Sequence, residues 1–209
     1  MDDTKKTRPE RTFWFTVARG FAYFMTALFF PVTYHGLQNY ELDAPYIIIA
    51  NHKHWFDPLL VGVKVKRYEV RYLGKKELAA NRFTRWITGK LHMIVVDRHN
   101  SDLSAMRACV NTVRQGHVLG IFPEGTRCKD STMKHLESGA AFIALRCKVP
   151  LVPVLVDRPA KLWRRVNVYV GRPVETADLY AQPVDASTVA LLLDRMRNAV
   201  LALAPEKTA

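Results

Sequence analysis

Cysteine is scarce in this sequence. The 209 residues include three cysteines (Cys109, Cys128 and Cys147), and no two of them lie close together. An odd number of separated cysteines argues against a disulfide framework and is typical of a reducing compartment. No CxxC or HxxEH-type spacing occurs, so we expect no structural zinc site.

Two motifs of large enzyme classes are also missing. There is no GxSxG segment, so the sequence lacks the nucleophile signal of a serine hydrolase. There is no GxxxxGK[ST] segment either, which argues against hydrolysis of nucleoside triphosphates. The sequence has no internal repeat, low-complexity tract or interdomain linker. Its length therefore predicts one domain, or one domain with an appendage.

Acidic side chains are few compared with basic ones. The chain has 19 acidic and 31 basic residues, which gives a formal net charge of +12. Such an excess indicates an anionic partner: lipid headgroups, nucleic acid or an acidic protein. Nine basic residues fall within residues 64–90, interleaved with aromatic ones. This mixture is typical of a membrane interface or a nucleic-acid surface, and its alternative is an ordinary solvated helix face.

The N-terminal part is, by contrast, rich in apolar and aromatic residues. Residues 13–32 would roughly cross a bilayer at a helical rise of about 1.5 Å per residue. A crossing helix would bury Arg19 at a cost of about 2.5–3.5 kcal/mol, and the basic residues before it would keep the N-terminus in the cytoplasm. We therefore expect residues 1–35 to form a helical segment in the membrane interface, ahead of a domain at 36–209. The alternative is a buried helix that covers the core.

Apolar runs and helical patterns alternate along the rest of the chain. Residues 46–50 are apolar without alternation, as expected of a buried parallel strand, and Asp57-Pro58 is a typical helix start. From residue 102 a helix is expected to bury Leu103, Met106, Val110 and Val113. The pattern predicts an α/β fold, with a mainly parallel central sheet flanked by helices on both faces. Further strands are expected at 68–73, 93–96, 118–122, 151–156 and 166–170, and further helices at 75–89, 139–148 and 186–203.

Two polar segments follow expected strands. NHKHWFD occupies residues 51–57, and FPEGTR occupies residues 122–127. Functional groups of α/β proteins gather at the carboxyl ends of the strands. We therefore expect both segments to line one crevice.

The first segment contains a histidine and an aspartate five positions apart. Asp57 can accept a hydrogen bond from one ring nitrogen of His52, which leaves the other nitrogen free to take a proton. Base catalysis of this kind contributes about 10²–10⁴-fold to a rate. Two alternatives stay open at this point: His54 is the partner of Asp57, or Asp57 is only a helix cap and His52 a core histidine.

The second segment is suited to binding an anion. Gly125 allows close approach of the backbone, and adjacent amides in such a turn bind oxyanions. Thr126 adds a hydroxyl, and the planar fork of Arg127 suits a phosphate. Glu124 is placed to orient Arg127 or to bind a substrate hydroxyl. Because no protein nucleophile is indicated, a hydroxyl on a phosphate-bearing substrate fits both segments together.

Both segments, in this order, resemble those of the glycerolipid acyltransferase family. The resemblance is strongest over residues 46–156 and is supported by residues 75–78, 96–98 and 149–154. It implies that His52 deprotonates an acceptor hydroxyl, which then attacks an acyl thioester, and that Asp57 orients His52. It also implies that Pro153 lines the acyl side of the site. The anion contacts that it implies are Lys75, Arg98, Glu124, Gly125, Thr126 and Arg127.

The resemblance also implies the substrates. The donor would be acyl-CoA or acyl-carrier protein, and the acceptor the lysophosphatidic acid 1-acyl-glycerol-3-phosphate, which becomes phosphatidic acid. It implies no metal, cofactor or nucleic acid, and a peripheral or monotopic place on the anionic cytoplasmic face of the cell membrane. Residues 53–56 are bulkier than is usual in the family, which leaves another lysophospholipid or an aminolipid as alternative acceptors. A thioesterase and a non-catalytic membrane- or nucleic-acid-binding module are the remaining alternatives.

Overall fold

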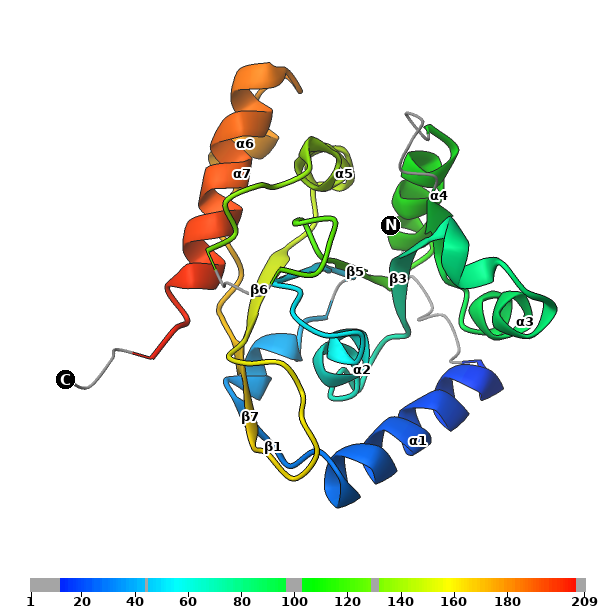
Figure 1. Cartoon of the computed structure of the whole chain (residues 1–209). Helices are drawn as coiled ribbons and strands as arrows, with labels where there is room; N and C mark the ends of the chain where they lie inside the picture. The colour runs from blue at the N-terminus through cyan, green and yellow to red at the C-terminus, as the bar shows by residue number, and fades with distance from the viewer. Residues whose placement is uncertain (1–11, 44, 97–102, 129–131, 206–209) are drawn as a thin grey trace, which may run out of the picture.

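The protein is built on one seven-stranded sheet with the strand order β1-β7-β6-β2-β5-β3-β4 (Figure 1). The computed structural model describes residues 12–43, 45–96, 103–128 and 132–205. Only the β6–β7 pair is antiparallel among the pairings of these strands. The predicted α/β fold with a mainly parallel sheet is confirmed. The strands are β1 (Val32–His35), β2 (Ile47–Ala50), β3 (Val70–Lys75), β4 (Ile94–Val96), β5 (Val118–Ile121), β6 (Leu151–Val156) and β7 (Val166–Val170).

Strand β2 lies at the centre of the sheet, and all four of its residues are buried. Its side chains alternate between two cores, because successive residues of a strand point to opposite faces. Ile47 and Ile49 pack in the core on one face, whereas Ile48 and Ala50 pack in the core on the other. A strand covered on both faces is expected to be apolar throughout, as this one is.

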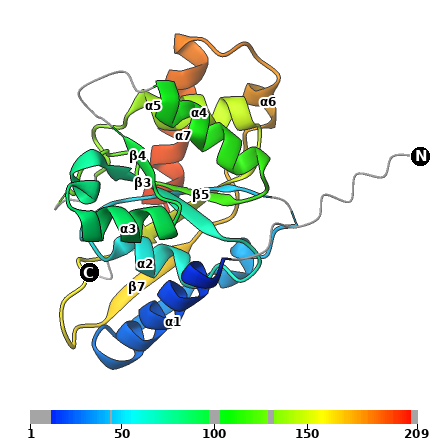
Figure 2. The ribbon, with the colours of Figure 1, turned by 90° about the vertical axis from the view of Figure 1, so that its right-hand side faces the viewer.

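Helices cover both faces of the sheet (Figure 2). One face carries α4 (Leu103–Arg114), α5 (Ser138–Cys147), α6 (Ala177–Tyr180) and α7 (Ala186–Leu201). The other carries α1 (Phe13–Leu28), α2 (Asp57–Gly62) and the 3-10 helix η1 (Leu37–Tyr40). The 3-10 helix η2 (Lys76–Ala79) and α3 (Arg82–Lys90) follow β3 at the edge of the sheet.

Three details differ from the sequence-based expectation. The edge strand β1 was not predicted, and it joins the N-terminal segment to the sheet by pairing with β7. The helix predicted over 75–89 is divided, because Asn81 caps a new helix by accepting a hydrogen bond from the N–H of Thr84. The predicted buried face of α4 is correct only in part. Val113 is buried and Val110 is partly buried, but Leu103 is 62% exposed, and the helix also buries Ala105, Cys109 and Thr112.

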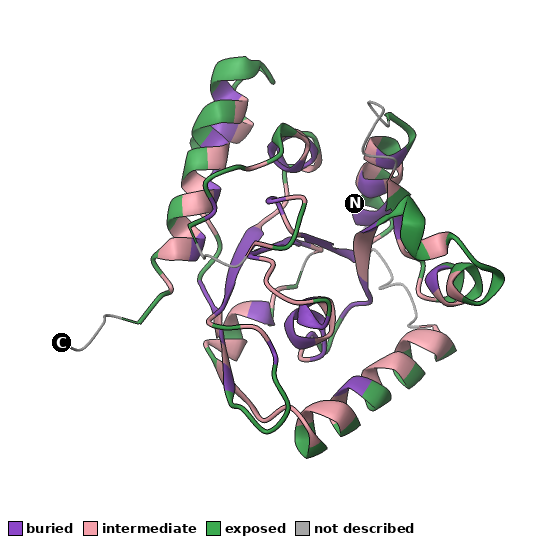
Figure 3. Cartoon of the chain, viewed as in Figure 1, coloured by how far each residue is buried: buried purple, intermediate pink, exposed green. Residues whose placement is uncertain are grey.

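The N-terminal helix α1 packs only part of its surface against the protein (Figure 3). Ala22 is its buried residue, and Phe15 and Met25 pack partly against the core. No helix in the described ranges is both long and apolar enough to cross a membrane. Large apolar side chains recur at helical spacing along the outer side of α1, and each is between 45% and 71% exposed: Phe13, Val17, Phe21, Phe24 and Leu28.

Candidate active site

The first polar segment is fixed to the sheet by Asn51, which follows β2 directly. Asn51 is fully buried. Its side-chain oxygen accepts a hydrogen bond from the backbone N–H of Val156 at 2.8 Å, and its amide nitrogen donates to the Val156 carbonyl at 3.0 Å. The pair continues the β2–β6 pairing by one residue through a side chain. The loop that begins at His52 therefore starts from a rigid position.

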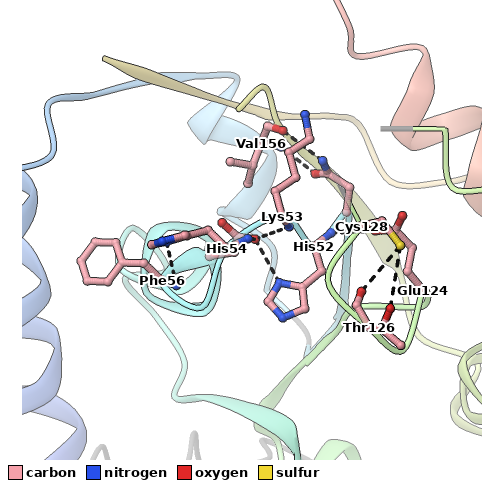
Figure 4. Close-up of polar contacts among 10 residues, drawn as sticks. His52, Lys53, His54, Phe56, Glu124, Thr126, Cys128 and Val156 are labelled. Atoms are coloured by element: carbon pink, nitrogen blue, oxygen red, sulfur yellow. Dashed lines mark hydrogen bonds and ion pairs between the residues drawn. The ribbon is translucent and has the colours of Figure 1, made fainter. Parts of the chain in front are cut away.

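His52 and Asp57 lie in direct contact. Nδ1 of His52 is 3.0 Å from Oδ2 of Asp57. Asp57 is fully buried, and the His52 side chain is 18% exposed. The other ring nitrogen, Nε2, points away from the carboxylate (Figure 4). This is the geometry that proton transfer at Nε2 requires.

Two backbone groups hold the same carboxylate oxygen. Oδ2 of Asp57 accepts hydrogen bonds from the N–H of Lys53 at 2.6 Å and from the N–H of His54 at 2.7 Å. These bonds wrap residues 53–54 around the carboxylate and fix its direction. The imidazole of His54 instead accepts a hydrogen bond from the N–H of Phe56, so the side chain that contacts Asp57 is that of His52. Oδ1 of Asp57 is buried without a hydrogen-bond partner in the part of the chain that the structure describes.

The two polar segments are hydrogen-bonded to each other through His52. Its N–H donates to Oε2 of Glu124 at 2.8 Å, and its carbonyl accepts from the N–H of Cys128 at 2.8 Å. Glu124 is 7% exposed. The sequence predicts that Glu124 orients Arg127 or binds substrate, and it gives no sign of this bond to the backbone of the histidine. The two polar segments thus lie side by side at the strand ends, as predicted.

A tight turn follows at Gly125. Its N–H donates to the carbonyl of Phe122 at 3.0 Å, and its φ of +65° lies in the left-handed region. A Cβ at this position would lie 3.0 Å from Cγ of Glu137, so both the backbone conformation and the space favour glycine. Thr126 and Arg127 are exposed. Within the described residues, Arg127 makes no ion pair or side-chain hydrogen bond, which leaves its guanidinium available to a ligand.

The two remaining predicted anion contacts are less closely tied to the dyad. Lys75 is exposed at the end of β3. Because Tyr72 pairs with Gly120 in the β3–β5 register, Lys75 leaves the sheet at the same edge as the FPEGTR segment. Arg98 lies outside the described residues. Lys75 thus shares an edge with the dyad without a contact to it.

Lys53 occupies a position that the sequence marks only as unusually bulky. Its Nζ donates to the carbonyl of Asp157 at 2.6 Å. Burial lowers the pKa of Lys53, although the charges of Asp157 and Asp57 act in the opposite direction. The bond ties the loop that carries His52 to the end of β6.

An apolar cavity of about 1090 Å³ opens beside His52. Its lining includes His52, Phe122 and Gly125, and its other walls come from α4, α5, α7 and the ends of β3 and β4. The sequence does not separate these wall residues from core residues, because both have the same apolar spacing. Pro153, predicted to line the acyl side, is absent from the wall and lines a separate hollow beside Gly171 and Leu203. Apolar wall residues include Leu73, Met106, Cys109, Ile143, Val189 and Leu193.

Together, the fold and the site define an α/β protein with an aspartate–histidine pair beside an apolar cavity. Residues 31–157 match the protein-family model described as Acyltransferase. This match covers more than half of the chain, and the chain belongs to that family.

Characterised relatives agree with the assignment. The chain is 31% identical over 157 residues to a 1-acyl-sn-glycerol-3-phosphate acyltransferase of Bacillus subtilis, across 73% of this chain and 78% of that protein. It is 30% identical over 143 residues to the Streptococcus pneumoniae protein of the same name, across 66% of this chain. The chain spans about half (53%) of the length of that second relative.

A solved structure shares the fold. The crystal structure of the 1-acyl-sn-glycerophosphate (LPA) acyltransferase PlsC from Thermotoga maritima aligns with a TM-score of 0.68 at 20% sequence identity. The alignment covers 90% of this chain and 78% of that one. It thus includes most of the described helices and strands.

Proposed function

We propose that this acyltransferase moves an acyl chain from a thioester donor to the free hydroxyl of 1-acyl-glycerol-3-phosphate, which gives phosphatidic acid for phospholipid biosynthesis. The observation that carries the proposal is the His52–Asp57 pair, whose histidine lines the apolar cavity. The activity named for the Bacillus subtilis relative supports the acceptor. The same chemistry on another lysophospholipid or an aminolipid is the second candidate, because the bulky residues 53–56 adjoin the dyad.

In the proposed reaction His52 is the general base. Nε2 takes the proton of the acceptor hydroxyl while the hydroxyl oxygen attacks the thioester carbon, and Asp57 stabilises the resulting imidazolium through Nδ1. The tetrahedral intermediate then breaks its carbon–sulfur bond. The departing thiolate recovers the proton from His52, so the enzyme returns to its starting state.

The acyl chain of the donor is proposed to lie in the cavity. Burial of each CH₂ group there stabilises the complex by about 0.8 kcal/mol. The position of His52 in the lining of this apolar cavity supports a binding mode in which the carboxyl end of such a chain lies beside the base. Acyl-CoA and acyl-carrier protein both fit this arrangement, since the cavity holds only the part that they share.

The acceptor phosphate is proposed to bind at the turn after β5. Arg127 supplies a guanidinium without an ion-pair partner among the described residues, and Gly125 and Thr126 add backbone and hydroxyl groups. Lys75 and Arg98 are the proposed further anion contacts. Glu124 is proposed to serve the site through its bond to the backbone of His52.

We also propose that α1 lies in the interface of an anionic membrane, on the cytoplasmic face, where thioester donors are made. In this proposal residues 1–35 are the interface segment and residues 36–209 the acyltransferase domain. Trp14 of α1 packs on Trp86 of α3 at 4.9 Å, and Phe29 packs on Trp163 at 5.9 Å. Trp86 and Trp163 are 47% and 65% exposed. They extend the apolar stripe of α1 on two sides, as expected of an interfacial surface.

A panel of acceptors tests the activity. Wild type and His52→Ala are each given labelled acyl-CoA or acyl-carrier protein with lysophosphatidic acid, other lysophospholipids, an aminolipid and no acceptor. We expect phosphatidic acid from wild type alone. Equal rates for acceptors with and without a terminal phosphate would overturn the lysophosphatidate assignment. Equal release of free fatty acid with and without acceptor would indicate a thioesterase.

A further inference from the structure

We propose that Tyr72 is a positioning residue for the base His52, and that it acts through the ring of Phe122. The proposal rests on the proposed function, in which His52 takes the acceptor proton. Tyr72 does not touch the site polar groups. It lies at the base of a column of three rings that ends at the imidazole.

The three rings are stacked nearly parallel. The centroids of the His52 and Phe122 rings are 4.3 Å apart with an interplanar angle of 27°. Those of Phe122 and Tyr72 are 6.0 Å apart with an angle of 19°. The column crosses three segments, because the rings belong to the loop after β2, the end of β5 and strand β3. One face of the imidazole is thus in contact with the ring of Phe122, and that ring is in turn stacked on the ring of Tyr72.

Two glycines make the space for Tyr72. A Cβ at Gly120, its partner in the β3–β5 register, would lie 2.1 Å from Cε1 of Tyr72. A Cβ at Gly62 would lie 2.5 Å from the Tyr72 oxygen. Neither glycine has a positive φ, so the reason for glycine is the close approach of the ring. The tyrosine ring is therefore clamped between β5 and the end of α2.

This clamp also connects Tyr72 to the other half of the dyad. Gly62 is the last residue of α2, and Asp57 is the first. The same side chain that supports Phe122 under His52 therefore rests against the helix that carries Asp57. A shift of the Tyr72 ring moves both partners of the 3.0 Å contact between Nδ1 and Oδ2.

The hydroxyl group does not explain why a tyrosine occupies position 72. Its oxygen is buried without a hydrogen-bond partner within the described part of the chain. Burial raises the pKa of Tyr72 well above its ordinary value, so the group stays neutral and takes no part in proton transfer. A buried hydroxyl without a partner is unfavourable. What Tyr72 supplies is the flat ring and its volume.

A fixed ring plane matters to this reaction. The imidazole must keep Nδ1 on Asp57 while Nε2 reaches the acceptor hydroxyl, and misplacement by about 1 Å costs about 100-fold in rate. The face of an aromatic ring also attracts the imidazolium that forms in the transition state. Both effects appear after the substrate has bound, so they change kcat rather than KM.

Paired substitutions test the proposal, with Tyr68 as the matched control. Tyr68 is a buried tyrosine, 2% exposed, of the core against which the partly buried Tyr72 packs, and its ring packs on Tyr46 outside the column. We expect Tyr72→Phe to keep kcat within about a factor of two, and Tyr72→Met to lower kcat about tenfold with little change in KM. Tyr68→Met lowers the melting temperature but keeps kcat. Equal losses in Tyr72→Phe and Tyr72→Met, or in Tyr72→Met and Tyr68→Met, would overturn the proposal.

A second variant and a spectroscopic measurement keep the proposal testable if Tyr72→Met does not fold. Phe122→Leu removes the middle ring directly, and we expect a loss of kcat at least as large as that of Tyr72→Met. The ring resonances of His52, assigned with His52→Ala in histidine-labelled protein, should shift in Phe122→Leu and stay in place in Tyr72→Phe and Tyr68→Met. Unshifted resonances in Phe122→Leu would overturn the proposal. The resonance measurement needs no substrate. If these shifts are observed but the wild-type protein has no acyltransferase activity, only the proposed function is contradicted.

Discussion

Thr12 and Glu69, 57 positions apart, join the start of α1 to the start of β3. The backbone N–H and the hydroxyl of Thr12 both donate to Oε2 of Glu69, each at 3.1 Å. Oε1 of the same carboxylate is 3.0 Å from Nδ1 of His92 and 3.4 Å from Nε of Arg71. Glu69 is 1% exposed. Burial alone would raise its pKa, but the hydrogen bonds from Thr12 and His92 and the charge of Arg71 outweigh burial, and the pKa of Glu69 is lowered.

This lowered pKa predicts a loss of stability in acid. The unfolded carboxyl has a pKa of about 4.3, so its contribution to folding is complete above that pH and is lost as the pH falls through the lower folded pKa. At pH 7 we expect Glu69→Gln to reduce the free energy of unfolding by about 1–3 kcal/mol. Melting temperatures of both proteins between pH 7 and pH 3 check this.

The difference between the two proteins is the quantity to follow. Burial lowers the pKa of His117, and the charge of Arg71 adds to this effect, so stability also falls with pH below the ordinary histidine range in both proteins. The difference in melting temperature between wild type and Glu69→Gln should disappear as Glu69 becomes protonated. A gap that stays constant with pH would contradict the assignment of the acid loss to Glu69.

Asp57→Asn should separate catalysis from folding. The oxygen of an asparagine amide can keep the place of Oδ2 and its three hydrogen bonds, while the amide nitrogen takes the place of Oδ1, which has no partner in the described chain. We expect an unchanged fold and a kcat lowered about 10²–10⁴-fold, because the imidazolium loses its counter-charge. Circular dichroism with steady-state kinetics measures both. Full activity would mean that Asp57 acts only as a helix cap.

Arg127→Ala should weaken binding of a phosphate-bearing acceptor. Loss of a charge-assisted hydrogen-bonding group is worth about 1.5–3 kcal/mol, so we expect KM for lysophosphatidic acid to rise about 10- to 100-fold with a smaller change in kcat. Arg172→Ala is the control, since Arg172 is also exposed but lines the separate hollow beside Gly171. A fall in kcat alone would assign Arg127 to the transition state instead.

The cavity predicts a chain-length effect. Val189 lines its wall, whereas Leu191 on the same helix is 46% exposed and is not part of the wall. Val189→Phe should reduce kcat/KM for long acyl donors more than for short ones, by about fourfold for each CH₂ group that no longer fits. Leu191→Phe should leave the series unchanged. Parallel curves for Val189→Phe and wild type across donors of increasing length would exclude this cavity as the acyl site.

The exposed stripe of α1 predicts membrane binding. Phe21 and Phe24 are 56% and 59% exposed, and burial of each in lipid contributes about 1.5–3 kcal/mol. Phe21→Ser with Phe24→Ser should release the protein from anionic vesicles in a sedimentation assay, while activity on acceptor in detergent persists. Ala27→Ser, on the same exposed side, is the control. Vesicle binding that survives the double change would move the lipid contact to another surface, such as α3.

Local sequence patterns were sufficient for the central features. The isoleucine run at residues 47–49 indicates a doubly covered strand by composition alone, and the positions of NHKHWFD and FPEGTR at strand ends follow from the parallel arrangement. The spacing of His52 and Asp57 across a strand-to-helix turn allowed their contact, but it also left His54 open as the partner, and the family resemblance was what favoured His52. These signals all act within a few residues.

Other features depend on contacts between distant segments. Strand β1 contains polar residues and is ordered through its pairing with β7, more than 130 residues away. The bond from Glu124 to the backbone of His52 and the column beneath that histidine likewise join residues about 50 to 70 positions apart. The buried face of α4 was predicted only in part, because it also includes the small side chains of Ala105 and Cys109. Apolar spacing does not identify such partners.

The helix α1 is fastened at both ends. Thr12 holds its start at the amino end of β3, and the carbonyl of Phe29, just past its last turn, accepts a hydrogen bond from the N–H of Trp163 at 2.9 Å, in the loop that leaves the carboxyl end of β6. Because the two ends of α1 are hydrogen-bonded to separate parts of the sheet, the helix cannot tilt independently of the domain. A membrane that binds α1 therefore meets the domain in one fixed orientation. The depth to which α1 enters that membrane then determines the distance of His52 from the membrane surface.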